Sequence, residues 1–362
     1  MERTNSVPEL TYVNIYLTWT CNFRCIHCWV EGDSVVDTLL DVERVLRFIT
    51  EAKQEGISSV RITGGEPLVH KNELIKIIEH VSKLNLDCQI ETNAYLFDRE
   101  FIDFIARKHV SCGISLNGYN EEMNDNFTMK KGAFNRVVDN IKKALDAGVK
   151  VSVITCVGKY NLNEFEKTID FIFDLGVESV KINPVTNCGR GSELYEKGLI
   201  FDEIEMKEFF EKYKALRAKY GQKIMTMIPP SFDTLENIEE AGIYVCGGSH
   251  LLSYLPNNKI ALCGYGGIND DITLCEFTDE TNVHDIWNFN EKLINIRKTF
   301  YCLAGVCGSC IHGKACMSLC KVQGLSEYGS WNSPYPVCQK LYEKGLFPSS
   351  RLYKEVENSW AE

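Results

Sequence analysis

The chain has 362 residues, of which 44% are apolar and 25% are charged, and its formal net charge at pH 7 is −11. This length and apolar content are sufficient for a large buried core or for two domains. The excess of acidic residues, without a basic stripe, disfavours binding to a phosphate backbone, so we expect no nucleic-acid partner.

The opening stretch MERTNSVPEL is polar and is followed by no apolar core segment, so no signal peptide is recognisable. No apolar run approaches the roughly 18 residues of a membrane span. We therefore expect a cytoplasmic protein with no membrane partner. Sixteen cysteines in such a chain predict metal ligation or redox chemistry rather than disulfides, because cytosolic thiols are kept reduced.

From residue 12 to about residue 185, short β-branched runs alternate with longer segments that carry apolar residues at helical spacing. The predicted strands are residues 13–18, 57–63, 86–92, 110–116, 149–155 and 177–184. The predicted helices between them are residues 37–56, 71–85, 98–109, 132–148 and 162–176. This alternation is typical of βαβ units around a parallel sheet, and it predicts an α/β fold with a partial (β/α)6 TIM-like barrel.

The sequence after residue 185 differs in composition and in hydrophobic periodicity from the segment before it. Another helix is predicted over residues 201–221, and beyond residue 236 the chain is rich in Cys, Gly, Asn and Tyr and holds nine of the sixteen cysteines. We therefore predict an N-terminal extension, the barrel, a helical bridge and a small, Cys-rich, metal-stapled domain. The predicted ranges of these four parts are 1–12, 13–200, 201–235 and 236–362.

Cys21, Cys25 and Cys28 follow the first predicted strand within eight residues. The loops after the strands of a parallel barrel gather at one mouth, where active sites lie. Three thiolates are one fewer than a structural zinc site or a fully ligated four-iron cluster requires. Three cysteines that hold a [4Fe–4S] cluster leave one iron open to a small molecule, and the odd ligand count predicts such an open cluster.

The spacing Cys-x3-Cys-x2-Cys after the first strand, with TGGEP at residues 63–67 after the second, resembles the radical S-adenosylmethionine (SAM) enzyme superfamily. The resemblance implies that the amino and carboxylate groups of SAM chelate the open iron. It implies that an electron from the reduced cluster cleaves SAM, and that the resulting 5′-deoxyadenosyl radical abstracts hydrogen from the substrate. An external electron donor, a flavodoxin or a ferredoxin, is then expected, and so is an anaerobic setting.

The same resemblance suggests which residues bind SAM. Gly64 and Gly65 let the backbone approach a ligand closely, and Glu66 can meet an ammonium group. Taken alone, this segment is a strand-ending turn with a charged tip. Trp29 offers an aromatic face to the adenine, with His27 as the alternative.

Further candidates for SAM binding are polar residues at the ends of later strands, namely Ser115, Asn117, Asn183 and Arg190. Ser115 and Asn117 are candidates for the ribose or the methionine carboxylate, and Asn183 for backbone contact with adenine. Arg190 either pairs with a carboxylate or is a solvated loop charge. Weaker candidates, Thr92 and Asn93, end the third strand.

A second constellation of cysteines has the spacing Cys-x2-Cys-x5-Cys-x3-Cys-x17-Cys from residue 307 to residue 338, preceded by Cys246 and Cys263. It resembles the SPASM extension of radical SAM enzymes, which holds two auxiliary [4Fe–4S] clusters. A pair of structural zinc sites is the alternative that Cys-x2-Cys spacing permits. With the radical-cluster motif, the resemblance implies three [4Fe–4S] clusters and SAM as cofactors.

Position by position, the SPASM resemblance divides these cysteines into two sets. Auxiliary group I is Cys246, Cys263 and Cys320, and auxiliary group II is Cys307, Cys310, Cys316 and Cys338. No cysteine lies between Cys246 and Cys263, so the cluster of group I is either open at one iron or completed by Cys275 or Cys302.

SPASM relatives mostly modify ribosomally made peptides through thioether or carbon–carbon crosslinks, and we predict a peptide-modifying radical SAM enzyme, with epimerisation as another outcome. The alternatives are an enzyme of tetrapyrrole or small-cofactor biosynthesis, an anaerobic sulfatase maturase, and a non-catalytic iron–sulfur electron carrier or sensor. Sulfatase maturation ranks low, because those relatives place an Asp base after the second auxiliary cysteine and here Gly264 follows Cys263.

The barrel begins close to the start of the sequence, which leaves no room for an N-terminal leader-binding domain. We therefore expect a peptide substrate to be recognised by a separate small protein or by the barrel mouth. The sequence assigns no catalytic acid or base.

Overall fold

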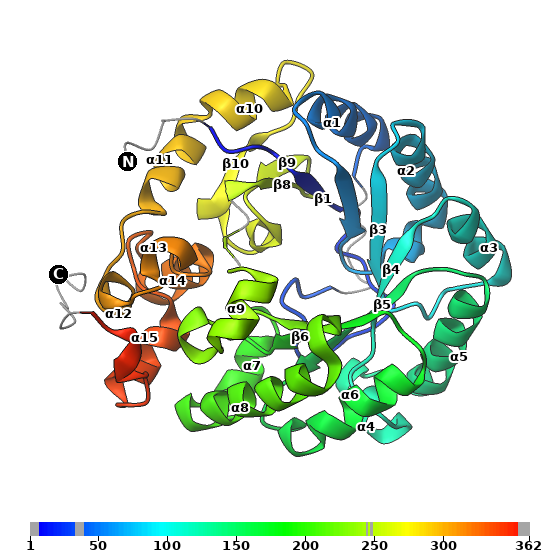
Figure 1. Ribbon diagram of the computed structural model, residues 1–362. Helices are drawn as coiled ribbons and strands as arrows, with labels where there is room; N and C mark the ends of the chain where they lie inside the picture. The colour runs from blue at the N-terminus through cyan, green and yellow to red at the C-terminus, as the bar shows by residue number, and fades with distance from the viewer. Residues whose placement is uncertain (1–6, 33–39, 244, 247–248, 354–362) are drawn as a thin grey trace. The chain divides into compact units, whose positions relative to one another are not determined.

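The computed structural model describes residues 7–32, 40–243, 245–246 and 249–353 (Figure 1). The chain divides into two compact units. Unit 1 is Met1–Ile200 with Gly247–Asn290, and unit 2 is Phe201–Cys246 with Glu291–Glu362. The predicted domain ranges do not follow this division, because residues 247–290 belong to the unit that contains the barrel.

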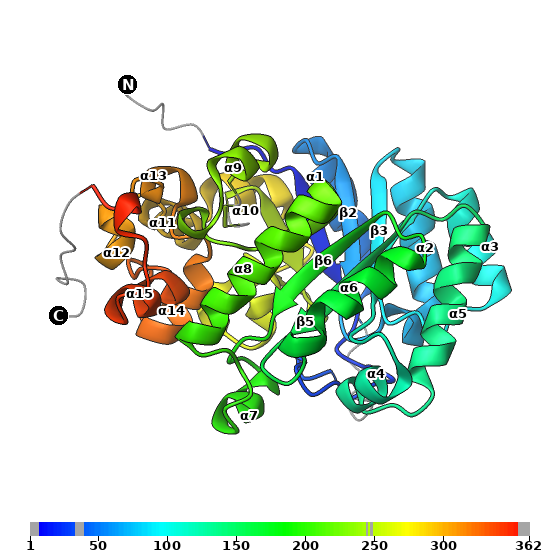
Figure 2. The ribbon, with the colours of Figure 1, turned by 60° about the horizontal axis from the view of Figure 1, so that its bottom comes forward.

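Six parallel strands in sequential order form the centre of unit 1. They are β1 (Tyr12–Tyr16), β2 (Ser59–Thr63), β3 (Asp87–Thr92), β4 (Ser111–Ser115), β5 (Val151–Val157) and β6 (Ser179–Pro184). Helices lie outside them: α1 (Val42–Gln54), α2 (Lys71–Lys83), α3 (Arg99–Arg107), α4 (Glu121–Thr128), α5 (Ala133–Asp146), α6 (Phe165–Asp174) and α7 (Gly191–Glu196) (Figures 1 and 2). The predicted α/β class and parallel sheet are confirmed, while α4 and α7 were not predicted.

Alternation along the strands separates the two faces of the sheet. Val13, Ile15, Val60, Ile62 and Ile90 are each at most 1% exposed, and they face the helices. The helices present apolar stripes in return and begin at residues whose side chains cap the first turn, as in α1 and α3. The polar residues between these aliphatic positions therefore lie on the opposite, concave face.

The sheet of unit 1 continues beyond β1 in a way that the sequence analysis missed. Strand β8 (Leu251–Tyr254) pairs parallel with the free edge of β1, and β9 (Lys259–Ala261) and β10 (Thr273–Glu276) follow in antiparallel order. Helix α10 (Val283–Phe289) comes next. The first strand is therefore interior to the sheet, with β2 on one side and β8 on the other.

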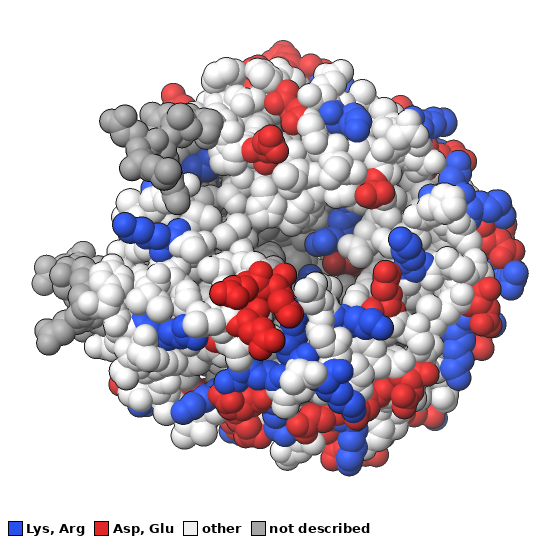
Figure 3. Space-filling view, viewed as in Figure 1, with Lys and Arg blue, Asp and Glu red and all other residues white. Residues whose placement is uncertain are grey.

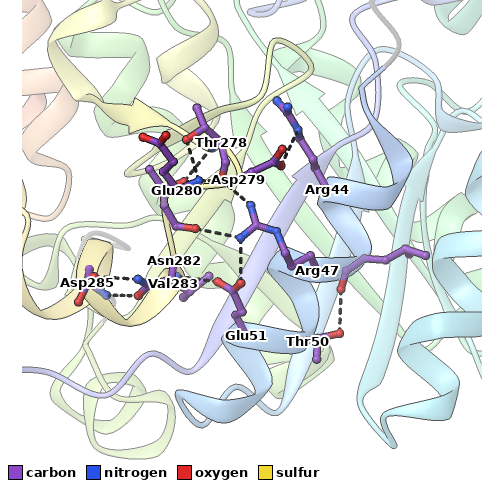
Figure 4. A network of polar contacts seen from close by, with 12 residues as sticks. Arg44, Arg47, Thr50, Glu51, Thr278, Asp279, Glu280, Asn282, Val283 and Asp285 are labelled. Atoms are coloured by element: carbon purple, nitrogen blue, oxygen red, sulfur yellow. Dashed lines mark hydrogen bonds and ion pairs between the residues drawn. The ribbon is translucent and has the colours of Figure 1, made fainter.

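A polar network ties this late segment to α1 (Figure 4). The Arg47 guanidinium donates to the carbonyl oxygens of Thr278 and Thr281, the latter at 2.9 Å. Glu51 accepts from the Arg47 guanidinium at 3.1 Å and from the backbone N–H of Val283 at 2.9 Å. Hydrogen bonds to charged groups are stronger than neutral ones, so this network anchors residues 278–283 to the barrel.

Unit 2 consists mainly of short helices. Its elements are α8 (Glu203–Tyr220), β7 (Ile224–Thr226), α9 (Leu235–Ala241), α11 (Glu291–Thr299), α12 (Gly305–Ser309), α13 (Gly313–Cys316), α14 (Lys321–Tyr328) and α15 (Pro336–Glu343). A chain of aromatic contacts joins Phe209, Phe210, Phe232 and Phe347, with ring centroids 5.1–5.9 Å apart. Helix α8 was predicted over residues 201–221, whereas α9 and α11–α15 are too short to show a helical period in the sequence.

No helix among the described residues has the length and apolar character needed to span a membrane. On the face shown in Figure 3, basic and acidic side chains are interspersed around the outer helices of unit 1.

Candidate functional site

The radical-cluster loop, residues 17–32, follows β1 and carries Cys21, Cys25 and Cys28, all partly buried. The backbone N–H of Phe23 donates to the Cys21 sulfur at 3.4 Å. The Asn93 side-chain amide, at the end of β3, lies 4.0 Å from the same sulfur. The Cys21 sulfur therefore has two N–H donors beside it, as sulfur ligands of iron–sulfur clusters have.

Burial makes Cys21 and Cys25 poor acids in the absence of a cation. It raises the pKa of Cys21 to about 12 and the pKa of Cys25 well above its ordinary value. The negative charges of Cys21 and Cys28 raise the pKa of Cys25 further, so the three groups act on one another. Clustered, mutually repelling thiolates are stabilised by metal ions, and this donor set fits a [4Fe–4S] cluster.

Arg190 lies against the radical-cluster loop. Its Nε donates to the Cys25 carbonyl at 2.9 Å, its Nη2 to the Gly32 carbonyl at 3.1 Å, and its backbone N–H to the Cys28 carbonyl at 3.0 Å. Gly189, at φ 55°, has no room for a side chain, because a Cβ would overlap the carbonyl oxygens of Trp29 and Cys28. Of the two predicted roles for Arg190, a solvated charge does not apply, since its guanidinium holds the loop.

The GGEP turn, residues 64–67 after β2, also packs on the radical-cluster loop. The N–H groups of Gly65 and Glu66 donate to the carbonyl oxygens of Thr18 and Thr20 at 2.7 and 2.8 Å. A Cβ at Gly64 or Gly65 would overlap backbone atoms of residues 17–20. The two glycines thus permit close approach to the protein's own loop, whereas the sequence analysis predicted close approach to a ligand.

Glu66 is 1% exposed and links β2 to β3. Its carboxylate accepts from the Thr92 hydroxyl at 2.7 Å, from the Asn93 N–H at 2.7 Å and from the Leu68 N–H at 3.0 Å. Burial raises its pKa, and these hydrogen bonds act in the opposite direction. A carboxylate offers about four acceptor positions, so about one stays available for an ammonium group.

The other predicted SAM ligands lie at strand ends in different surroundings. Asn117 is 2% exposed, and its Oδ1 accepts from the Cys156 N–H at 2.8 Å, which makes it a link between β4 and β5. Ser115 and Asn183 are partly exposed at the ends of β4 and β6. His27 is stacked on Phe127 with centroids 4.4 Å apart, and burial lowers its pKa to about 3, so it stays neutral.

An aromatic wall borders the loop, made of Tyr16, Trp19, Trp29 and Tyr265. Trp29 is stacked on Tyr265 at 5.1 Å and meets Tyr16 edge-on at 6.0 Å. One face of the indole that was predicted to stack on adenine is therefore covered by Tyr265. A Cβ at Gly264 would overlap the Tyr16 hydroxyl and the Trp29 ring, so this position excludes the aspartate that sulfatase-maturing relatives carry.

The concave face of the sheet carries a polar strip that the sequence analysis did not identify. Asn14, Ser253, Arg61 and Gln89 are cross-strand neighbours on β1, β8, β2 and β3. Arg61 Nε donates to Gln89 at 3.0 Å and lies 3.6 Å from Glu91. Asn14 Oδ1 and Ser253 Oγ are buried without a hydrogen-bond partner in the described chain. Polar residues that alternate along a strand predict that one face of the strand is polar. They do not distinguish a face in contact with solvent from a face in contact with a substrate, so the sequence carries no specific signal for this strip.

Auxiliary group II comes together within unit 2. Cys307, Cys310, Cys316 and Cys338 are 7–9% exposed and line one cavity of about 310 Å³, a volume that includes its opening. The N–H groups of Tyr335 and His312 donate to the sulfurs of Cys307 and Cys310, each at 3.4 Å, and the Ser231 hydroxyl lies 3.1 Å from Cys310. Four thiols with N–H donors around one cavity fit a [4Fe–4S] cluster.

The backbone between the auxiliary groups adopts an unusual conformation. Met317, Ser318 and Leu319, between Cys316 and Cys320, have positive φ values of 51°, 62° and 52°. Left-handed conformations cost roughly 1–2 kcal/mol for each residue with a side chain. Three in succession indicate a turn whose shape is imposed by its surroundings.

Auxiliary group I is divided between the units. Cys246 and Cys320 belong to unit 2, and the charge of Cys246 raises the pKa of Cys320, which burial has already raised. Cys263 belongs to unit 1, as does Cys275 in β10, whereas Cys302 is exposed in unit 2. Among the described residues, no three His, Cys, Asp or Glu side chains are placed to hold a single metal ion.

Comparison with known proteins gives similarities over part or most of the chain. Residues 15–172 match the model of the Radical SAM superfamily. The chain is 26% identical over 245 residues to the antilisterial bacteriocin subtilosin biosynthesis protein AlbA of Bacillus subtilis, covering 62% of this chain and 54% of AlbA. It is 27% identical over 347 residues to the AdoMet-dependent heme synthase of Methanosarcina barkeri, covering 91% and 95%.

Similarity of fold to solved structures covers more of the chain than residues 15–172, which match the family model. Streptococcus suis SuiB, in a crystal structure with bound S-adenosylmethionine, superposes with a TM-score of 0.71 over 91% of this chain and 78% of SuiB, at 19% identity. Such coverage includes most of the cysteine-rich region. The matched segment, residues 15–172, is a radical SAM domain.

Proposed function

We propose that this radical SAM enzyme modifies a ribosomally made peptide by removing hydrogen from an unactivated C–H bond, which leads to a crosslink or an epimerised residue. The observation that carries the proposal is the fold shared with SuiB, which has also been crystallised with its precursor peptide SuiA. The partial likeness to AlbA, named for the biosynthesis of a bacteriocin, supports the same substrate class.

Cys21, Cys25 and Cys28 hold the radical-generating cluster, with SAM beside it. When bound, cluster and SAM supply the one-electron chemistry that breaks a C–H bond. Arg190 fixes the loop backbone; burial raises the pKa values of Cys21 and Cys25, and the positive charge of Arg190 acts in the opposite direction, toward the ligating thiolates. Glu66 would accept a hydrogen bond from the ammonium group of SAM, and Ser115, Asn117 and Asn183, at the ends of β4 and β6, would hold other parts of the cofactor.

The concave polar strip is suited to a peptide. Arg61 is paired with Glu91 and Gln89, so the charge of its guanidinium is compensated. These three side chains are partly exposed. Backbone amides supply both donors and acceptors for such polar groups.

Auxiliary groups I and II hold two further [4Fe–4S] clusters, with Cys275 or Cys302 as candidates for the missing ligand of group I. Their role is to accept an electron from the substrate or to hold it. A flavodoxin or ferredoxin delivers the initiating electron, and either a separate small protein or the barrel mouth itself recognises the peptide. Iron and sulfide analysis of the reconstituted protein should correspond to three clusters rather than one.

A second candidate function is haem-type tetrapyrrole biosynthesis, which the nearly full-length match to the heme synthase of Methanosarcina barkeri favours. A tetrapyrrole with several carboxylates requires several cations around it. The polar strip provides Arg61, already paired with Glu91, and for this reason we rank the peptide first.

The test is an anaerobic reaction of the reconstituted enzyme with SAM, dithionite and a short peptide encoded beside its gene. Loss of two hydrogens per modified site, seen by high-resolution mass spectrometry, is expected for a crosslink, and deuterium uptake without net mass change for an epimer. Modification of a tetrapyrrole with no peptide change would refute the proposal in favour of the second candidate. Cys25→Ala should abolish 5′-deoxyadenosine formation, and persistent formation would overturn the site assignment.

A further inference from the structure

A basic patch on the surface of unit 1 has no role in the function proposed above. It consists of Arg24 in the radical-cluster loop, Lys130 and Lys131 between α4 and α5, and Arg136 near the start of α5. Arg24, Lys131 and Arg136 are exposed and Lys130 is half-buried, while the neighbouring Met129 is 63% exposed. Four cationic side chains gather here although the formal charge of the whole chain is −11.

Backbone hydrogen bonds hold this patch against the loop that carries the three cysteines. The N–H groups of Arg24 and Ile26 donate, at 3.3 and 3.0 Å, to carbonyl oxygens at the end of α4, those of Thr128 and Phe127. Figure 2 shows α4 beside the loop that follows β1. Arg24 directly precedes the second cysteine of that loop, so the patch covers one side of the predicted cluster site.

Tyr95, which follows β3, connects the patch with the cysteines. The Lys130 ammonium and the Arg136 guanidinium lie 5.4 and 4.5 Å from the centroid of its ring, and Arg136 Nε donates to its carbonyl oxygen at 2.7 Å. The Phe23 ring packs edge-on against the Tyr95 ring at 5.4 Å, and the Phe23 N–H donates to the Cys21 sulfur at 3.4 Å. A short series of packed residues therefore leads from the surface cations to a cluster ligand.

Neighbouring carboxylates do not neutralise the patch. Within the part of the chain that the structure describes, Lys130, Lys131 and Arg136 form no ion pair. The Asp125 carboxylate accepts from two backbone N–H groups at the start of α5, and Glu121 accepts from an amide side chain of that helix. Exposed charge of one sign attracts a partner of the opposite sign and speeds their encounter.

We propose that this basic patch is the docking surface for the electron donor, an acidic one-electron carrier protein of the flavodoxin or ferredoxin kind. The inference rests on the proposed function, in which the adjacent loop holds the radical-generating cluster. One electron passes from the reduced carrier, which is oxidised, to the cluster, which is reduced, and no bond forms or breaks between the two proteins. The patch shares no residue with the concave polar strip, so the carrier and the peptide would occupy different surfaces.

The experiment measures 5′-deoxyadenosine formation from SAM by the full-length, reconstituted enzyme with two sources of electrons. One is a photoreduced acidic flavodoxin or an acidic ferredoxin, and the other is dithionite, a small reductant that requires no docking surface. The test variant is Lys130→Glu with Lys131→Glu. The matched control, Lys142→Glu with Lys150→Glu, has the same change of charge at exposed lysines elsewhere in unit 1. Iron content and circular dichroism are recorded for each protein.

The test variant should require a carrier concentration about tenfold higher for half-maximal rate at low salt, because a local field of one sign changes association rates by this order or more. The difference should fade toward roughly 1 M salt, where the screening length is about 3 Å. The rate with dithionite, and the carrier dependence of the control, should match the parent. Lys130→Gln with Lys131→Gln should give a smaller change in the same direction, and it serves as the test if charge reversal prevents folding.

Equal carrier dependence in the parent and the test variant would overturn the inference, and so would a parent that turns over with dithionite but with neither carrier. A higher KM for the peptide in the test variant, measured with dithionite, would also overturn it, because the patch would then bind the substrate. Absence of 5′-deoxyadenosine from the parent with dithionite would refute the radical SAM activity itself, and the inference with it.

Discussion

Replacement of Arg190 by Met removes the guanidinium that holds the radical-cluster loop. Two side-chain hydrogen bonds are lost, to the carbonyl oxygens of Cys25 and Gly32, while the backbone bond to Cys28 remains. Hydrogen bonds of charged groups contribute about 1.5–3 kcal/mol each, and the partial exposure of Arg190 reduces this to about 2–3 kcal/mol for both. Without them the empty loop loses its shape, and the cost of ordering it opposes cluster binding.

A loss of about 2–3 kcal/mol corresponds to cluster retention about 30- to 150-fold weaker. The assay is anaerobic competition with an iron chelator, followed by the visible absorbance of the cluster, in variants whose auxiliary cysteines are replaced so that one cluster remains. Arg99→Met is the control, because Arg99 is 74% exposed and pairs only with Asp103 on the outer side of α3. Retention in Arg190→Met equal to the parent would refute the positioning role of Arg190.

Two further substitutions test the site. Gly264→Ala should destabilise the protein by about 1–3 kcal/mol, since the added methyl group overlaps the Tyr16 hydroxyl and the Trp29 ring. Tyr16→Phe in the same chain should restore part of the lost stability. An unchanged melting temperature in Gly264→Ala would show that the aromatic wall moves aside at no cost, against this reasoning. Glu66 has a pKa raised by burial, so the folded state binds more protons than the unfolded state, and stability from this group increases as pH falls toward its ordinary pKa. Glu66→Gln should lack this increase in stability between pH 7 and pH 5, so its melting temperature relative to wild type should change over that range. A difference between the two melting temperatures that is the same at pH 7 and pH 5 would contradict the reasoning.

The barrel could be predicted because each of its βαβ units is local. A strand of β1–β6 pairs with the next strand in the sequence, and the helix between them shows its own period. Strand β8 carries no such cue, because its partner β1 lies about 239 residues earlier and its four residues are too few to show alternation. Non-local pairing is decided by the completed fold, so the predicted boundary near residue 236 separated β8–β10 from the barrel sheet to which they belong.

The candidate site could be predicted as a set of residues but not as a set of contacts. The spacing of Cys21, Cys25 and Cys28 predicts the radical-cluster loop as the site, but nothing in the spacing shows which groups pack against that loop. A Cβ at Gly64 would meet the backbone of residues 17–18, and Tyr265 covers one face of the Trp29 ring, and the spacing predicts neither contact. Roles of this kind depend on segments that are distant in sequence.

The anchoring of the radical-cluster loop has a consequence for biosynthesis. The loop is complete early in translation, yet its clamp at Arg190 and its aromatic neighbour Tyr265 leave the ribosome more than 160 and 230 residues after Cys28. At about 5–20 residues per second, the three thiols wait roughly 10–50 s before their surroundings exist. Throughout that interval they are exposed on a nascent chain, so the timing of iron delivery relative to elongation determines how many molecules acquire a cluster before oxidation reaches the thiols.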